Sequence, residues 1–144
     1  MRHHGACFEH EQERNEELIR VYHRVIEEAD YVVMPDIYEK VARSPSSRFW
    51  VSKERAAIII SNIMRGDTLS GMNPTKKEMY MEIYRRAIDI MKKQPSLTFQ
   101  EVAFKVVHQP APSFYLTSGS AKVIICKARK KWYEERKRKL RHLF

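Results

Sequence analysis

The most constraining feature of this sequence is an imperfect tandem repeat. The stretch RFWVSKERAAIIISNI, which starts at Arg48, returns 65 residues later as SFYLTSGSAKVIICKA, which starts at Ser113. Residue types stay in register, so that Phe49 matches Phe114. Farther upstream the offset becomes 62, and the change falls in a connection, where differences in length cost little. A repeat of this kind predicts two copies of one small helical unit.

The hydrophobic pattern predicts an all-α protein. Apolar residues follow the spacing of one helix face at matching positions of both copies: Leu18, Val21, Tyr22 and Val25 in the first, and Tyr80, Ile83, Tyr84 and Ala87 in the second. We expect helices at about 11–29, 36–43, 53–65 and 75–93, a fifth from residue 98 and a sixth after residue 117.

The expected organisation is two tandem three-helix repeats with pseudo-twofold symmetry inside one compact body. A flexible N-terminus covers 1–10 and the first repeat covers 11–66. A linker at 67–74, rich in turn residues, precedes the second repeat at 75–144, which ends in a long basic helix.

Local signals mark the helix ends and the core. Ser52 is a natural N-cap for the third helix, which Gly66 ends, and Thr98 with Glu101 forms a capping box. Phe49 and its repeat partner are too apolar for a solvated turn, so both are expected in the core.

Charge is distributed unevenly along the chain, whose net charge is +9. The first 33 residues carry eight acidic and four basic residues, whereas the segment from Lys122 onward carries ten basic and two acidic ones. A basic segment of this density attracts polyanions, of which nucleic acid is the commonest.

The C-terminal segment KARKKWYEERKRKLRHLF combines this charge with apolar residues at helical spacing, including Trp132 and Leu140. We expect Trp132 to pack against the protein's own core near Tyr80 and Tyr84, which leaves 136–141 exposed. Such a basic amphipathic helix binds phosphates, an acidic protein partner or a membrane surface, and nucleic acid is the reading we favour.

A short middle helix followed by a turn and an N-capped third helix resembles the helix-turn-helix family. The resemblance implies that the third helix lies in the major groove of double-stranded DNA and contacts base edges. In the first copy the resemblance implies that the reading positions are Lys53, Glu54, Arg55, Ala57 and Ser61, followed by Asn62 and Arg65. The side chains among them that suit bases and phosphates are Lys53, Arg55, Asn62 and Arg65. The turn is longer here than in the usual motif.

The sixth helix begins with Ser118, Gly119 and Ser120, which either approach a phosphate through their backbone or simply start the helix. We therefore expect the first copy to read sequence and the second to hold the backbone. The nucleic-acid-binding residues predicted in the second copy are Ser118, Ser120, Lys122, Lys127, Lys130, Lys131, Arg136, Lys137, Arg138, Lys139 and Arg141.

The wording P-x-x-R-F-W-V-S-x-E-R-A, from Pro45 to Ala56, is also similar to that of small uncharacterised proteins of bacterial mobile elements and prophages. This resemblance implies a regulator or accessory factor of such an element. The rival hypothesis is an adaptor or structural component that binds protein through its repeats and docks its basic tail on an acidic neighbour or RNA.

Other function classes find no support in the sequence. No apolar run approaches the about 18 residues of a membrane span, and two cysteines make no disulfide framework, so we expect a cytoplasmic protein without a membrane partner. The spacing of His3, His4, Cys7 and His10 is too loose for a structural zinc site. We expect no catalytic residues, no cofactor and no metal.

Overall fold

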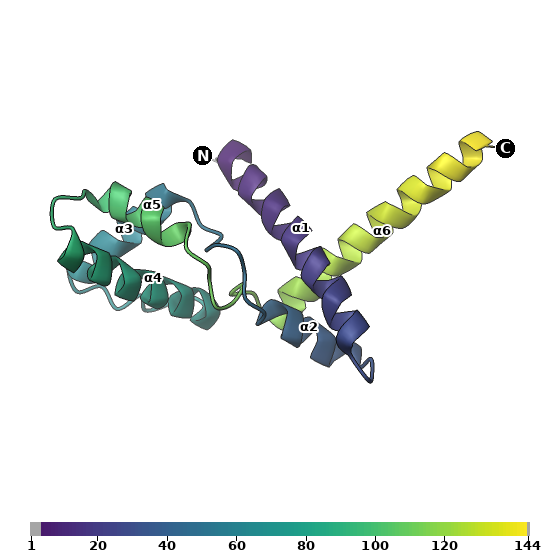
Figure 1. The fold of residues 1–144 in the computed structure, drawn as a ribbon, viewed down its shortest axis with the longest axis horizontal. Coiled ribbons are helices and arrows are strands. Elements are labelled where there is room, and N and C mark those ends of the chain that lie inside the picture. Colours follow the sequence, from purple (N-terminus) through teal and green to yellow (C-terminus); the bar gives the residue numbers. More distant parts are fainter. Residues whose placement is uncertain (1–3, 144) are drawn as a thin grey trace.

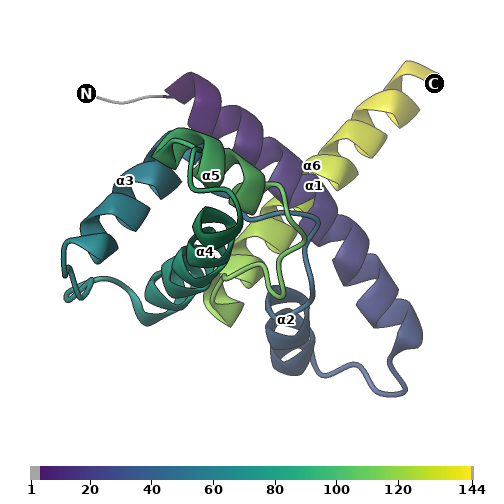
Figure 2. The same ribbon diagram turned by 60° about the vertical axis from the view of Figure 1, so that its left-hand side comes forward.

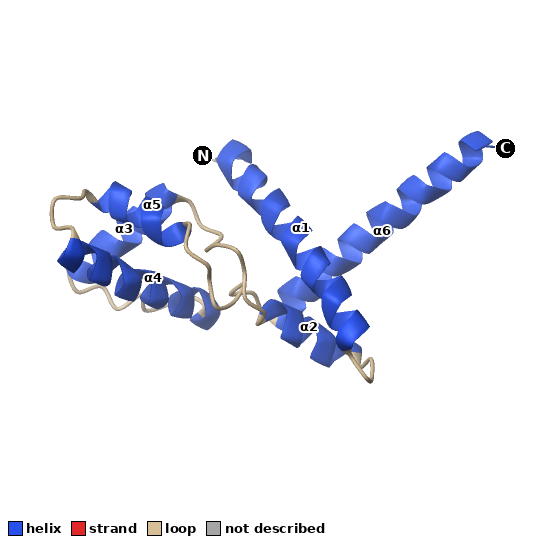
Figure 3. Ribbon diagram, in the orientation of Figure 1, coloured by secondary structure: helices blue, strands red, loops and turns tan. Residues whose placement is uncertain are grey.

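The computed structural model describes residues 4–143, with side chains from residue 10 onward. Within this part the chain is all-α and forms six helices without a strand, as the sequence predicted. The helices are α1 (His4–Glu28), α2 (Met34–Ala42), α3 (Lys53–Met64), α4 (Pro74–Lys93), α5 (Phe99–Val107) and α6 (Ser118–Leu143). Figure 3 shows how loops alone connect them. No described helix is long and apolar enough to cross a lipid bilayer.

The predicted caps are confirmed. Ser52 accepts a hydrogen bond from the backbone amide of Arg55 at 3.1 Å, and Thr98 accepts one from the amide of Glu101 at 3.2 Å. Each bond satisfies one of the amides that a helix start leaves without an intrahelical partner. Gly66 follows α3 at a φ of +102°, which only glycine adopts without strain.

The helices pack in two groups that do not follow chain order. One group joins α3, α4 and α5, and the other joins α1, α2 and α6 (Figures 1 and 2). Among the described residues α2 and α3 share no contact, and neither do α5 and α6. The packing therefore differs from the expected grouping of 11–66 and 75–144, because each third helix packs on the first two helices of the other repeat.

Two connections that meet side by side produce this exchange. The amide of Ser46 donates to the carbonyl of Ala111 at 2.9 Å, and the amide of Ala111 donates back to the carbonyl of Ser46 at 2.9 Å. The connection from α2 to α3 thus crosses the one from α5 to α6. As a result, α3 packs on α4 and α5, and α6 packs on α1 and α2.

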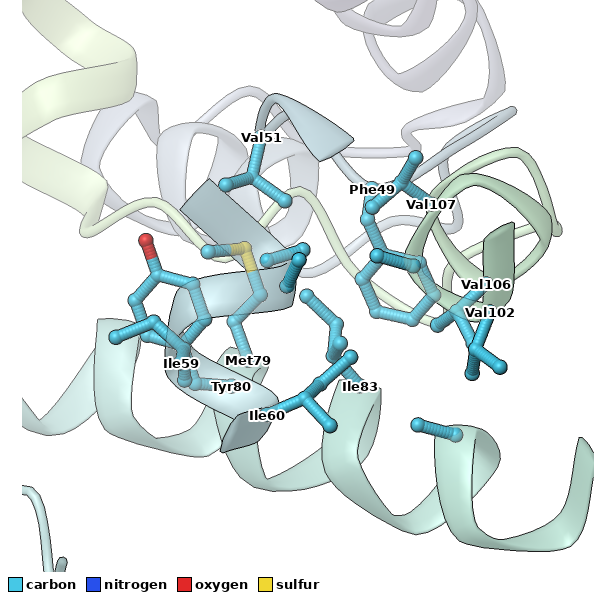
Figure 4. Close-up of a cluster of buried hydrophobic side chains, with 14 of the residues drawn as sticks. Phe49, Val51, Ile59, Ile60, Met79, Tyr80, Ile83, Val102, Val106 and Val107 are labelled. Carbon is cyan, nitrogen blue, oxygen red and sulfur yellow. The ribbon is translucent and has the colours of Figure 1, made fainter. Parts of the chain in front are cut away.

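The duplicated phenylalanines are both buried, which confirms their predicted place in the core. Phe49 is 1% exposed and lies among Ile83, Val102 and Val106 in the α3–α4–α5 group (Figure 4). Phe114 is 3% exposed and belongs to the core of the α1–α2–α6 group. Burying a phenylalanine in each core contributes about 2 kcal/mol of transfer free energy per side chain.

Three details differ from the sequence expectations. The helix α1 starts at His4 rather than near residue 11. Ala57, which faces outward in a helix-turn-helix reading, is buried against the α3–α4–α5 core. Trp132 does not pack near Tyr80 and is 52% exposed, because α6 has left the packed group before it reaches this residue.

Candidate nucleic-acid interface

The second half of α6 projects beyond both packed groups. Ala121 and Ile125 are the last buried side chains of the helix, and every side chain from 129 to 143 is exposed. Figure 1 shows this part, in yellow, leading away from the rest of the molecule. We call residues 129–143 the α6 arm. At 1.5 Å per residue the arm is about 22 Å long.

The arm carries dense and unneutralised positive charge. Its basic residues outnumber its two acidic residues, Glu134 and Glu135. None of the basic side chains of the arm forms an ion pair with any described side chain. Arg136 lies over the ring of Trp132, with 5.2 Å between the guanidinium carbon and the ring centroid. The basic side chains of the arm are Arg129, Lys130, Lys131, Arg136, Lys137, Arg138, Lys139 and Arg141.

An uncovered apolar stripe accompanies this charge. Trp132 and Leu143 are 52% and 76% exposed, and Leu140 is 47% exposed. At 3.6 residues per turn, Trp132 lies on the same side of α6 as the buried Ile125, seven residues earlier. The core-facing stripe of the helix therefore continues past the point where the core ends.

The four residues predicted on α3 do not form one surface. Lys53 lies toward α5, with its ammonium 5.8 Å from the ring centroid of Phe104. Arg55, two residues after Lys53, lies on the opposite side of the helix. Asn62, two turns after Arg55, lies on the same side as Arg55. Arg65 caps the C-terminal end of α3. Lys53, Arg55 and Arg65 are exposed and Asn62 is half-buried.

The start of α6 is occupied by its own cap. Thr117 accepts a hydrogen bond from the amide of Ser120 at 3.1 Å and donates from its hydroxyl to the Ser120 hydroxyl at 3.0 Å. Ser118, Gly119 and Ser120 are exposed, as are Lys122 and Lys127. The amide and the hydroxyl of Ser120 are thus already engaged within the first turn of α6.

A groove that sequence reasoning missed lies between α1 and α6. It has a volume of about 1210 Å³ and an apolar floor that includes Ile19, Val123 and Ile124. Its charged side chains are Glu11, Arg14, Glu16, Arg20, Lys127 and Lys131. We call it the α1–α6 groove. Val123, an apolar residue between Ser120 and Lys127 at helical spacing, is a sequence signal that could have indicated it.

Arg48 was also not predicted as a structural residue. Its side chain donates to the carbonyls of Phe49 and Val51 at 3.0 and 3.2 Å and lies 5.3 Å from the ring centroid of Trp50. Burial lowers the pKa of Arg48, and the nearby Glu13 carboxylate opposes this shift. Arg48 therefore fixes the connection before α3.

In the part of the chain that the structure describes, no three candidate metal-ligand side chains come together. His3, and the side chains of His4 and Cys7, lie outside the described residues. Cys126 is exposed, and its sulfur lies 3.9 Å from the Tyr38 hydroxyl.

Comparisons with protein-family models, with curated proteins and with solved structures found no match for this chain. We therefore base the proposed function on the geometry of the α6 arm and of α3.

Proposed function

We propose that this protein binds double-stranded DNA and that the α6 arm supplies most of the affinity. The observation that carries the proposal is the arm itself, a helix whose side chains are all exposed and whose basic residues have no ionic partner among the described side chains. Bringing phosphates to these side chains releases condensed counterions from the DNA, which favours binding irrespective of sequence.

The form of the arm suits a duplex. The major groove of B-DNA is wide enough for one α-helix, and basic helices that extend from a folded body enter it in several classes of DNA-binding protein. The arm is about 22 Å long, and one helical turn of DNA is about 34 Å long, so the arm spans more than half of a turn. Basic side chains stand on several sides of the arm, so phosphates of both strands come within reach.

Recognition of sequence is assigned to α3 in this proposal. Arg55 and Asn62 share one side of the helix and have the side-chain chemistry that contacts guanine and adenine edges. Lys53, on the opposite side of α3, contacts a phosphate in this proposal. Phosphate contacts position a protein on DNA, whereas base contacts give it sequence preference.

We also infer that the two groups of helices are the two halves of a fused dimer. Equivalent positions of the repeat make equivalent bonds, since Phe49 donates to the carbonyl of Val107 at 3.0 Å and Phe114 donates to that of Ala42 at 3.3 Å. A pseudo-twofold axis between Ser46 and Ala111 relates the halves in this inference. Dimeric DNA-binding proteins use such an axis to address two half-sites.

A protein-binding adaptor is the second candidate. The exposed Trp132, Leu140 and Leu143 favour it, because phosphates offer no partner for an apolar stripe. An interface of apolar side chains responds weakly to salt, whereas binding through several phosphate contacts weakens steeply as salt rises. Salt dependence therefore separates the two functions.

The test is the binding of a fluorescent duplex across a salt series by three proteins. The arm variant replaces Arg136, Lys137, Arg138 and Lys139 by Gln. The control replaces Lys76, Lys77, Lys92 and Lys93 by Gln, which removes the same charge from exposed positions of α4. We expect the arm variant to lose up to about 3.6 units of the log–log salt slope, at about 0.9 per phosphate contact, and the control to keep the wild-type slope. Equal slopes for both variants would contradict the proposal.

A further inference from the structure

The connection between α1 and α2 exposes three consecutive apolar residues. Tyr31 is 86% exposed, Val32 is 56% exposed and Val33 is 50% exposed. The exposed residues just before them are acidic: Glu27, Glu28 and Asp30. We call residues 27–33 the acidic tip. Uncovered apolar runs of this kind usually mark a contact surface, because they carry a cost in solubility.

The α1–α6 groove has the complementary chemistry. Its apolar floor is bordered by four basic side chains against two acidic ones, so its net charge is positive. The arm, which begins beside the groove, adds more positive charge. A ligand for this groove therefore needs an apolar anchor and a negative charge close to it.

The tip and the groove occupy different parts of α1. The groove is lined by α1 residues from Glu11 to Arg20, near the middle of the helix, whereas the tip begins in its last turn and continues past its C-terminal end at Glu28. Because a continuous helix separates them, a chain cannot place its tip in its own groove. A second copy meets no such restriction.

We propose that the acidic tip of one chain docks in the α1–α6 groove of a second copy. Tyr31 is the anchor that enters the apolar floor near Val123 and Ile124. Glu27, Glu28 and Asp30 face the basic border, in particular Lys127 and Lys131. This inference goes beyond DNA binding and does not depend on it.

The contact is heterologous, because two different surfaces of the same chain meet. Heterologous contacts extend head to tail until they close into a ring, and otherwise they form open filaments. The charge across the contact also predicts that high salt weakens the assembly.

Sedimentation velocity over a wide concentration range tests the proposal. The tip variant carries Tyr31→Ser and Val32→Ser, and the groove variant carries Val123→Glu. All three side chains are at least half exposed, so we expect the substitutions to leave the fold intact. Ile58→Glu is the matched control, because Ile58 is 53% exposed on α3 and Val123 is 52% exposed on α6.

We expect the wild type and the control to grow beyond dimers as concentration rises, and each variant to associate at least about 30-fold more weakly, as when a hot-spot residue is lost. An equal mixture of the two variants should form dimers and nothing larger, since the mixture offers one intact tip for each intact groove.

Three results would overturn the proposal. A wild type that stays monomeric throughout would show that the groove takes a segment of another protein or none. Variants that assemble as the wild type does would place the contact elsewhere. A mixture of variants that stays monomeric would show that tip and groove are not partners.

Discussion

Ser46 and Ala111 exchange two backbone hydrogen bonds of 2.9 Å, and they stand 65 positions apart, at the offset of the sequence repeat. The pair occurs where the two connections cross, and Ser46 is 3% exposed. A reciprocal bond between equivalent residues is the arrangement that a twofold axis produces. It links the repeat seen in the sequence to the exchanged packing seen in the structure.

After cleavage of the linker between α3 and α4, the two halves of the chain should remain associated. A protease site inserted between the exposed Ser70 and Gly71 interrupts the chain without touching the buried Leu69. Because α3 packs on α4 and α5, and α6 on α1 and α2, the cleaved halves are expected to elute together and to separate only in denaturant. Halves that separate in native buffer would show that each repeat packs on itself.

Truncating either repeated phenylalanine should be costly. Phe49→Ala and Phe114→Ala are each expected to lower the free energy of unfolding by about 3 to 5 kcal/mol, the usual loss for a buried phenylalanine. Urea unfolding of both variants measures this. A loss below about 1 kcal/mol would contradict the burial of that side chain.

The carboxylate of Glu17 is hydrogen-bonded to the connection between α2 and α3, at the point where it meets the connection between α5 and α6. It accepts hydrogen bonds from the amide and hydroxyl of Ser47 at 2.8 and 2.7 Å, and from the hydroxyl of Ser46 at 3.3 Å. We expect Glu17→Ala to cost about 1 to 3 kcal/mol and to speed amide exchange at residues 46–49. Glu16→Ala, at the exposed neighbour, is the control and should change neither quantity.

Stability should depend on Glu82 in mild acid. Hydrogen bonds from Arg85, and then from Arg86, lower the pKa of Glu82 despite its partial burial. A carboxyl whose pKa is lower in the folded state contributes stability that is complete above its unfolded pKa, about 4.3, and that is lost as pH falls through the folded value. The difference in unfolding free energy between wild type and Glu82→Gln should therefore shrink below about pH 4.3. A constant difference down to acid denaturation would contradict the ionic role.

Much of the fold was predictable because local signals determine it. The cap at Ser52, the cap at Thr98 and the glycine after α3 act within one turn of a helix, so their sequence patterns are sufficient. The repeat itself marked Phe49 and Phe114 as equivalent buried residues.

The exchange of third helices could not be predicted from the same signals. Since Phe49 and Phe114 are alike, the apolar pattern does not distinguish which third helix packs on the first two helices of each repeat. The crossing is held by contacts between distant segments, such as Glu17 with Ser47, and Arg86 with the carbonyl of Pro110 at 2.8 Å. Neither contact has a sequence signature.

The candidate site was predicted only in part. The charge of the tail is visible in the sequence, but the expectation that Trp132 packs against the core was wrong, because helical spacing does not reveal where a core ends. The α1–α6 groove was missed because its walls come from the two ends of the chain.

Hydrogen exchange with and without a duplex tests the central proposal most directly. Every side chain of the arm is exposed, so its amides should exchange quickly in the free protein. If the arm binds DNA, a saturating duplex should slow exchange across residues 129–143 more strongly than across α4, which carries its own exposed lysines. Binding of the duplex with unchanged exchange in the arm, or no binding of any duplex at low salt, would contradict the account.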